Sequence, residues 1–328
     1  MTRILIVAIH YPVASGRYCA DALRRMGHEV RTIGPETGAE IWGMTVDEKY
    51  IWRADVPADD WIPDLILVMD AHIALPAEWK FDCPVVVYGV DNHVRDYRQF
   101  DGMARAFFFA HNQVGNRVQN FDCKPGESFI DGMAINMLTG EGPAYNITWL
   151  PCGYDPVAFT PGPPYAERSF DAAIIGVLYN RRAELLGELV KIPNVRIAYG
   201  TGEVYDQYAA RYHDAKVSLV RSAAGDVAQR VWETAAMGCL ILMDDCPDCA
   251  ALGLRDSENC LIYHSVAEAV DQLKWAMAHP DIAEEIALGG YQWAAPGTWE
   301  ARCQVILDWL AGQKQEKPKR QKATEKSE

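Results

Sequence analysis

The sequence predicts an α/β protein with two doubly wound, Rossmann-like domains that face each other across a cleft. Short, nearly continuous apolar runs alternate with helical segments, which is typical of parallel sheets buried on both faces. A proline-rich stretch at residues 150–164 interrupts this alternation. The chain has 328 residues, enough for two domains of about 150 residues that each bury a core.

The first half holds five predicted strands, namely RILIVAI (3–9), EVRTIG (29–34), DLILVMD (64–70), PVVVYGV (84–90) and ARAFFFA (104–110). Residues 15–27 between the first two strands are predicted to be helical. Gly27 suits the end of that helix, because glycine adopts the left-handed backbone of a C-terminal cap at little cost. This β-α-β order predicts that residues 1–150 form the first domain.

The same order restarts in the second half, with strands predicted at DAAIIGVL (171–178), VRIAYG (195–200), KVSLVRS (216–222), CLILMDD (239–245) and NCLIYH (259–264). Ser265 and Glu268 form a capping box at the start of the next helix. The amphipathic segment 298–310 closes the second predicted domain, residues 151–311. In such sheets ligands bind outside the carboxyl ends of the strands, so the cleft is the expected site.

Composition excludes several classes of protein. The net charge of −14 argues against a surface that coats nucleic acid. No apolar run reaches the roughly 18–20 residues of a membrane span, so a cytoplasmic protein is expected. Nine cysteines, an odd number, do not suggest a disulfide framework. CPDC (246–249) has no second cysteine pair or Cys/His set beside it, and a zinc site normally needs four ligands, so no metal is expected.

Residues 312–328 differ from the rest of the chain in carrying six lysines and arginines against three glutamates. They contain no aromatic or large aliphatic residue and are expected to form a disordered basic tail. The tail could serve only to keep the chain in solution. Alternatively, it could hold a polyanionic acceptor such as DNA.

Several segments of the second half carry a resemblance when they are taken in order: WLPCGYDPVAFTP, IIGVLYNRRAELLGEL, YDQYAARYHDAKVSLV, RVWETAAMGCLILMDD and GTWEARCQVIL. Together they resemble the carboxyl-terminal half of GT-B glycosyltransferases, especially the branch similar to spore maturation protein CgeB. The resemblance covers about residues 146–311, whereas the first 145 residues share only the architecture. Its most specific part is the pattern formed by Arg230, Glu233, Ala236 and Gly238.

The resemblance implies a nucleotide-sugar site around Glu233. The matching carboxylate in these enzymes accepts hydrogen bonds from ribose hydroxyls, a role that suits an acceptor-only group. Arg181 or Arg182, at the start of a helix, would hold the diphosphate. A structural alternative is that Glu233 simply pairs with Arg230 or Arg221.

Other residues complete the expected nucleotide site. Gly176 and Arg230 fall within the resembling segments, and Tyr179 and Tyr205 could contact the base or ribose or serve only in packing. Gly16 resembles the glycine-bearing turn that approaches the donor or acceptor.

The helix before Glu233 is expected to begin near Gly225 and Asp226 and to direct its backbone N–H groups at the diphosphate. Retaining families place a second carboxylate eight residues before Glu233, where this chain has Gly225. Asp226 lies one position away.

The catalytic candidates follow strands of the first domain, and they are Asp91, His93 and His111. Asp70 and His72 form a further cluster of this kind. An inverting transfer needs a base within hydrogen-bond reach of the acceptor hydroxyl. A retaining transfer with internal return needs none, and a strand-end side chain could then bind the sugar instead.

The resemblance therefore implies a glycosyltransferase that needs no cofactor and uses a nucleotide sugar as co-substrate with an unidentified hydroxyl acceptor. The sequence lacks the Asp-x-Asp motif that binds the donor's metal ion in the other large class of glycosyltransferases, so the transfer is expected to be metal-independent. One alternative is a DNA-modifying glycosyltransferase that acts on hydroxymethylated bases, motivated by the basic tail. Two others share the fold, namely a nucleotide-sugar epimerase and a non-catalytic, nucleotide-binding coat-type protein.

Overall fold

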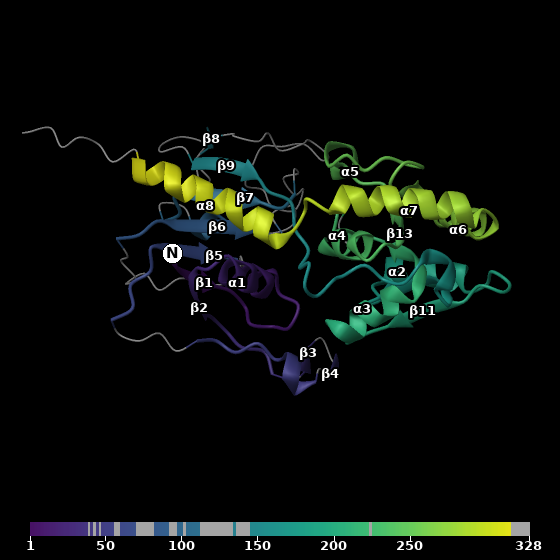
Figure 1. Cartoon of the computed structure of the whole chain (residues 1–328), viewed down its shortest axis with the longest axis horizontal. Helices are drawn as coiled ribbons and strands as arrows, with labels where there is room; N and C mark the ends of the chain where they lie inside the picture. Colours follow the sequence, from purple (N-terminus) through teal and green to yellow (C-terminus); the bar gives the residue numbers. More distant parts are fainter. Residues whose placement is uncertain are drawn as a thin grey trace, which may run out of the picture.

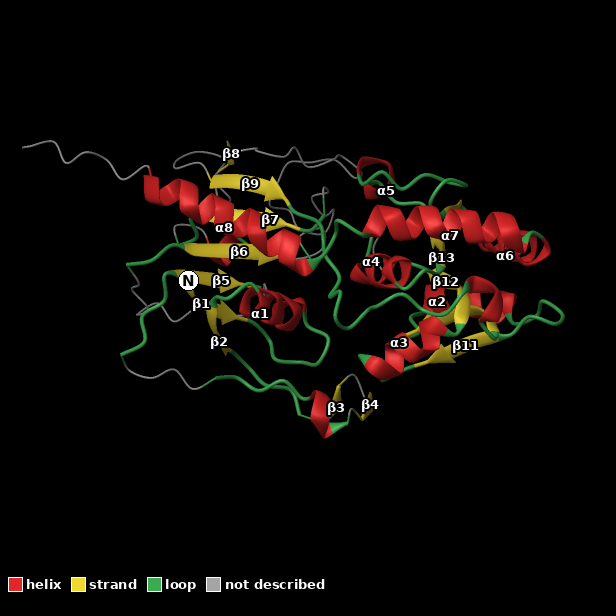
Figure 2. Ribbon diagram, in the orientation of Figure 1, coloured by secondary structure: helices red, strands yellow, loops and turns green. Residues whose placement is uncertain are grey.

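The computed structural model describes residues 1–38, 40–41, 44–45, 47–55, 60–69, 82–91, 97–100, 103–111, 134–135, 145–222 and 225–315. Figures 1 and 2 show two sheets next to each other, each flanked by helices. Both sheets are built mainly from parallel pairs, which confirms the predicted α/β class. No helix within the described ranges is long and apolar enough to cross a membrane.

The first sheet has the strand order β2-β1-β5-β6-β7-β9-β8 among the described residues. Its strands are β1 (Arg3–Val7), β2 (Glu29–Ile33), β5 (Leu65–Val68), β6 (Val85–Gly89), β7 (Ala106–Phe109), β8 (Ala134–Ile135) and β9 (Tyr145–Trp149). The five predicted strands are confirmed, and β9 was missed because polar Asn146 and Thr148 interrupt its apolar residues. A small hairpin of β3 (Glu40–Ile41) and β4 (Met44–Thr45) lies outside this sheet.

The second sheet is parallel throughout its described strands, in the order β11-β10-β12-β13-β14. Its strands are β10 (Phe170–Ile175), β11 (Ile197–Gly200), β12 (Ala215–Val220), β13 (Leu240–Asp244) and β14 (Leu261–Tyr263). The helices are α1 (Ser15–Arg25), α2 (Asn180–Leu189), α3 (Asp206–His213), α4 (Gln229–Ala236), α5 (Asp248–Ala251), α6 (Val266–Ala278), α7 (Pro280–Ala294) and α8 (Trp299–Gln315). Within the described ranges, short 3₁₀ turns occur at Glu48–Tyr50, Arg98–Phe100 and Tyr165–Glu167.

Both predicted helix ends are present. Gly27 follows α1 with φ +84°, and the amides of Gly27 and His28 donate to the last turn of the helix, as in a Schellman cap. At the start of α6, Ser265 accepts a hydrogen bond from the Glu268 amide, and the Glu268 carboxylate accepts one from the His264 amide. These caps fix where each helix meets its neighbouring strand.

The last helix, α8, follows the second sheet in sequence but packs against the first (Figure 1). The Sγ atoms of Cys303 and Cys19 lie 3.4 Å apart, and Glu300 forms an ion pair with Arg25 at 2.6 Å. The helix continues to Gln315, so the prediction of disorder is wrong for residues 312–315. Lysine and glutamine extend an established helix at little cost. Residues 316–328 lie outside the described ranges.

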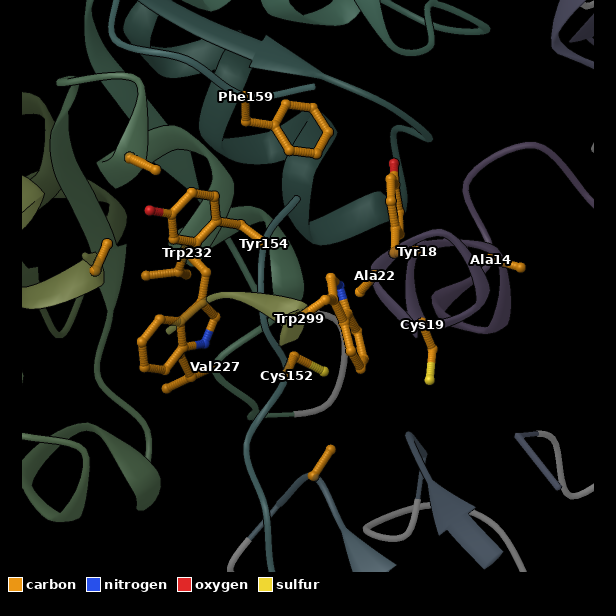
Figure 3. Close-up of a cluster of buried hydrophobic side chains, with 14 of the residues drawn as sticks. Ala14, Tyr18, Cys19, Ala22, Cys152, Tyr154, Phe159, Val227, Trp232 and Trp299 are labelled. Carbon is orange, nitrogen blue, oxygen red and sulfur yellow. The ribbon is translucent and has the colours of Figure 1, made fainter. Parts of the chain in front are cut away.

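The largest hydrophobic cluster among the described residues contains residues of both halves. Figure 3 shows Trp299 among Cys152, Ala22 and Cys19, with Trp232 of α4 nearby. Trp299 is 1% exposed and packs edge-on against Tyr88 of β6, with ring centroids 5.7 Å apart. The first residues of α8 therefore help to seal the junction between the halves.

Two segments of the described chain, around Tyr154 and Gly297, cross between the halves, and they are hydrogen-bonded to each other. The Tyr154 amide donates to the Gly297 carbonyl at 3.0 Å, and the Trp299 amide donates to the Tyr154 carbonyl at 2.9 Å. A Cβ atom at Gly153 would lie 2.9 Å from the Gly297 carbonyl oxygen. Only glycine allows this close approach without a shift of the backbone.

Candidate functional site

A cavity of about 380 Å³ opens where the carboxyl ends of the two sheets face each other. Such a position is typical of ligand sites in doubly wound folds. Its lining comes from both halves: Tyr11, Val13, Ser15, Tyr18, Val90, Asp91, His111, Cys152, Phe159, Ile175, Gly176, Val177, Tyr179, Arg182, Gly202, Glu203, Val204, Tyr205, Tyr208, Asp226, Ala228, Gln229, Arg230 and Glu233.

Glu233 lies on α4, with its side chain at the cavity and only 7% exposed. Its carboxylate accepts a hydrogen bond from Gln229 Nε2, one turn earlier, at 2.7 Å. Burial raises the pKa of Glu233, and contacts with Gln229, Tyr208 and Arg230 only partly offset that effect. No ion pair within 4.0 Å joins Glu233 to Arg230 or Arg221 in the described part of the chain, although the charge of Arg230 acts on Glu233 from a longer distance.

Arg230 lies one turn before Glu233 on α4, and its guanidinium is accommodated by a glycine. A Cβ atom at Gly176 would lie 2.6 Å from Arg230 Nη2, and Gly176 has φ +120°. Any side chain at position 176 would therefore displace the guanidinium as well as strain the backbone. Gly176, which directly follows β10, provides space for a cation at the cavity.

Arg182 is the second buried cation at the cavity. Its Nε donates to the Arg221 carbonyl at 3.0 Å and its Nη1 to the Val177 carbonyl at 3.1 Å. Burial, followed by the neighbouring charge of Arg230, lowers the pKa of Arg182 to about 10. It stays charged at neutral pH, so two close positive charges face the cavity. A ligand that carries negative charge would relieve their repulsion.

Arg181 occupies a different environment from Arg182. Its side chain is 52% exposed, lies outside the cavity lining and pairs with Asp244 at 3.9 Å. Asp244, at the end of β13, also accepts hydrogen bonds from the amide and hydroxyl of Ser222. The Ser222 hydroxyl in turn accepts from the Gly225 amide at 3.1 Å. Arg181 and Asp244 therefore support the segment that leads into α4 and do not line the cavity.

The carboxylate of Asp226 reaches the cavity lining and is 9% exposed. Helix α4 begins at Gln229, three residues after Asp226, which is later than the sequence suggested. Residues 223–224, just before this segment, lie outside the described ranges. Asp226 and Glu233 thus place two carboxylates at one cavity even though Gly225 stands at the expected position of the first.

Two tyrosines line the cavity from the second half. Tyr179 caps α2, is 47% exposed and stacks under the Arg182 guanidinium at 5.1 Å. Tyr205 donates from its hydroxyl to the Pro12 carbonyl at 2.6 Å and so contacts the first half. Its backbone has φ +49° and ψ −118°, a strained conformation for a residue with a side chain.

The first half contributes Asp91 and His111 to the lining. Asp91 follows β6 and is exposed, whereas His111 follows β7 and is buried. His93, Asp70 and His72 lie outside the described residues. His111 Nδ1 lies 3.5 Å from Oδ2 of Asp248, the first residue of α5 in the second half.

Gly16 lies inside α1 and outside the cavity lining. A Cβ atom there would lie 2.7 Å from the Ala8 Cβ atom, so this glycine brings α1 close to the residues that follow β1. Its neighbour Ser15 does reach the cavity, where its hydroxyl donates to Gln229 Oε1 at 3.1 Å.

Sequence reasoning missed Gln229, Tyr208 and Asp248. The spacing of Gln229 and Glu233, four residues apart on one helix, could have indicated the first. Asp248 lies within CPDC, whose Cys246 and Cys249 are buried with their Sγ atoms 3.1 Å apart. Within the described ranges, no group of three or more His, Cys, Asp or Glu residues could hold a metal ion.

Comparison with known proteins agrees with this geometry. Residues 166–308 match a family model described as glycosyl transferase-like. No curated protein matches the sequence.

Solved structures match the chain over nearly its whole length. A sucrose-phosphate synthase from Thermosynechococcus elongatus superposes with a TM-score of 0.63 at 13% identity, covering 96% of this chain and 100% of that one. An alpha-glucosyltransferase in complex with UDP-glucose and DNA containing an abasic site gives 0.63 at 11% identity, with coverages of 94% and 99%. Anabaena HepE in complex with UDP and glucose gives 0.60 at 10% identity, with coverages of 95% and 100%.

These similarities show the GT-B fold, and the family match covers most of the second half. The cavity lies between the two sheets of this fold, and part of its lining belongs to the matched residues.

Proposed function

We propose that the chain is a glycosyltransferase, which transfers a sugar from a nucleoside diphosphate sugar, with UDP as the first candidate carrier, to a hydroxyl group without a metal ion. The observation that carries the proposal is the cavity in which Arg182 and Arg230 lie beside the buried Glu233. Two cations and an acceptor-only group match a diphosphate and a pair of ribose hydroxyls. The resemblance of residues 146–311 to the CgeB-like branch is part of the proposal.

The proposed role of Glu233 explains why a carboxylate is kept in a buried place. Its pKa is raised by burial, so the charge costs free energy in the empty cavity. Two vicinal hydroxyls would donate hydrogen bonds to the carboxylate and offset that cost. Gln229 already donates to one of its oxygens and fixes its orientation.

Arg182 and Arg230 would stabilise the diphosphate as it leaves. Negative charge on the leaving nucleotide grows as the bond to the sugar breaks, and fixed cations lower the energy of that state. The α4 N-terminus, whose Ala228 and Gln229 also line the cavity, adds the positive end of a helix dipole. Asp91 and His111 would then face the sugar or the acceptor from the first half.

Ligand binding tests the donor directly. A thermal-shift panel with UDP, GDP, ADP and their sugars should raise the melting temperature of the full chain, because a ligand that binds only the folded state stabilises it. UDP and UDP-glucose are expected to give the largest shift, since proteins with this fold have been solved with them. A chain that none of these nucleotides stabilises would contradict the proposal.

Metal independence is a separate prediction. UDP release from UDP-glucose should continue at an unchanged rate in EDTA, because arginines and a helix dipole would take the place of a divalent cation at the diphosphate. A rate that falls to background in EDTA and returns with manganese or magnesium would contradict it.

DNA is the second candidate acceptor. One neighbour in fold was solved with UDP-glucose and DNA, and residues 312–328 carry six basic residues against three acidic ones. Incubation with UDP-[14C]glucose and DNA containing 5-hydroxymethylcytosine would give labelled DNA if this candidate is right. Conversion of the donor to another nucleotide sugar would instead indicate an epimerase, and nucleotide binding without turnover would indicate a coat-type protein.

A further inference from the structure

Tyr205 belongs to the second half, but its side chain is held by residues of the first. It directly precedes α3, and its hydroxyl donates to the Pro12 carbonyl at 2.6 Å. Its ring stacks on the ring of Tyr50, with centroids 5.6 Å apart and planes 15° apart. The central carbon of the Arg17 guanidinium lies 4.6 Å from the centroid of the Tyr205 ring, and Arg17 also donates to the Tyr50 carbonyl. We call Pro12, Arg17, Tyr50 and Tyr205 the clasp.

The clasp is largely shielded from water, which strengthens its contacts. Tyr50 and Val204 are buried and form a small hydrophobic cluster against which Tyr205 packs. Burial, which the charge of Arg17 partly offsets, raises the pKa of Tyr205, so its hydroxyl keeps the proton that it donates. The ion pair between Lys49 and Asp206 joins the same two segments at 3.7 Å, but both side chains are more than half exposed, and such pairs contribute little.

The backbone of Tyr205 is unfavourable for a residue with a side chain. Its φ of +49° and ψ of −118° are close to the first central position of a type II′ turn, which glycine, asparagine and aspartate dominate. A tyrosine keeps this conformation only where its contacts compensate for the strain. The hydrogen bond, the stacked ring and the guanidinium that do so all come from the other half. The strained turn therefore depends on the contact between the halves.

The clasp lies at the edge of the cavity. Tyr205 lines the cavity of about 380 Å³ and also a neighbouring groove of about 800 Å³. Arg17 and Tyr50 line the groove but not the cavity. Tyr205 thus forms a wall between the two spaces, and two of the residues that hold this wall do not line the cavity themselves.

We propose that the clasp holds the two halves together over the cavity and that it must open before a bound nucleotide leaves. Separation of the halves would break the hydrogen bond, the ring stack and the cation–π contact together, because all three meet on one side chain. The closed clasp rests on the contacts of Tyr205 alone. Its link to the nucleotide rests on the proposed function.

Hydrogen exchange followed by mass spectrometry tests the clasp in the ligand-free full chain. Tyr205→Phe removes only the hydroxyl, and the amides of residues 47–53 should then exchange about fivefold faster, the factor for one net hydrogen bond. Tyr50→Ala should have a similar effect on residues 202–209, because it removes the stacked ring. Each readout lies in the half that the substitution leaves unchanged. Wild-type exchange of both segments in these variants overturns the proposal.

Stopped-flow measurement of UDP dissociation tests the link to the cavity. Tyr50→Ala should release UDP about fivefold faster than wild type, although Tyr50 lies outside the cavity lining. Tyr205→Phe should do the same. The double variant should be little faster than either single variant, because both substitutions weaken the same contact. Wild-type dissociation from Tyr50→Ala, or fully additive effects in the double variant, overturns the proposal.

Tyr199→Phe is the matched control, since it makes the same substitution six residues before Tyr205. Tyr199 is 61% exposed and lines neither the cavity nor the groove. The variant should match wild type in both measurements, and exchange as fast as that of Tyr205→Phe overturns the proposal. A wild type that does not bind UDP would count against the proposed donor, whereas hydrogen exchange would still decide whether the clasp holds the halves together.

Discussion

The two halves meet the same cavity with different chemistry. The second half contributes five buried or half-buried charges, Arg182, Glu203, Asp226, Arg230 and Glu233. Among the described residues of the first half, the lining holds one carboxylate, Asp91, and one imidazole, His111, beside residues such as Val13, Tyr18 and Val90. A donor nucleotide presents phosphates and ribose hydroxyls that require fixed charges, whereas an acceptor is recognised mainly by shape and a few polar groups.

This difference explains which half carries a recognisable sequence. The match to the glycosyl transferase-like family lies in residues 166–308, where the charged lining of the second half is found. This difference predicts that substitutions of cavity residues in the second half weaken nucleotide binding, whereas substitutions of cavity residues in the first half do not.

The largest expected effect comes from the two buried arginines. Arg182→Ala and Arg230→Ala should each weaken UDP binding by about 1.5–3 kcal/mol, or about 10- to 150-fold, because each removes charged hydrogen bonds to phosphate. Uridine, which lacks phosphate, should be affected much less. Isothermal titration calorimetry with both ligands measures the difference.

Arg181→Ala is the control for this pair, since Arg181 is exposed and lies outside the cavity. It should bind UDP nearly as wild type does. If Arg181→Ala proved as damaging as Arg182→Ala, the assignment of the diphosphate to the buried arginines would be wrong.

Glu233→Gln should have an intermediate effect, and it should affect uridine and UDP alike. Replacing one acceptor oxygen with a donor should cost about 1–3 kcal/mol of binding free energy. Equal affinity of the variant and the wild type for both ligands, measured by the same calorimetry, would contradict the ribose contact.

The same variant should gain stability in the absence of ligand. Burial raises the pKa of Glu233 above its ordinary value of 4.5, so between these two pKa values the folded chain binds more protons than the unfolded one. The free energy of unfolding therefore falls as pH rises through that window, and Gln removes the penalty above it. Urea denaturation at pH 7 should show a more stable variant, and the advantage should shrink toward pH 4. A less stable variant at pH 7 would indicate a structural role.

The smallest effect is expected from removing residues 316–328, which follow α8. UDP affinity and UDP-glucose hydrolysis should stay the same at every salt concentration. If the tail holds DNA, its removal should weaken DNA binding and flatten the salt dependence, because fewer counterions are released. Filter binding between 50 and 200 mM salt distinguishes the two outcomes.

Local sequence patterns predicted the strands well because buried parallel strands need continuous apolar runs, and Gly27 and Ser265 carried clear capping signals. The patterns failed at α8, because an amphipathic face shows that a helix is buried but not against which sheet. The cavity lining was predicted in part. Arg182 and Arg181 are adjacent and identical in type, and only the three-dimensional structure separates the buried one from the exposed one.

Asp248 illustrates the limit of sequence reasoning at the site. It is 137 positions from His111 in the chain, and no local spacing connects them. The neighbouring Cys246 and Cys249 have the spacing of metal-binding cysteines, which suggests a different role for this segment. Long-range pairs of this kind follow from the packing of one half on the other, which a single sequence does not reveal.

The paired crossings at Tyr154 and Gly297 limit how the halves can move. A single connecting segment would let one half rotate freely against the other. Here two segments connect the halves, and hydrogen bonds of 2.9 and 3.0 Å join these segments to each other. Paired segments of this kind resist twisting of one half against the other more than a single segment would. If the halves move apart, the paired segments would guide them back to the same relative position. His111 would then lie beside the Asp248 carboxylate again.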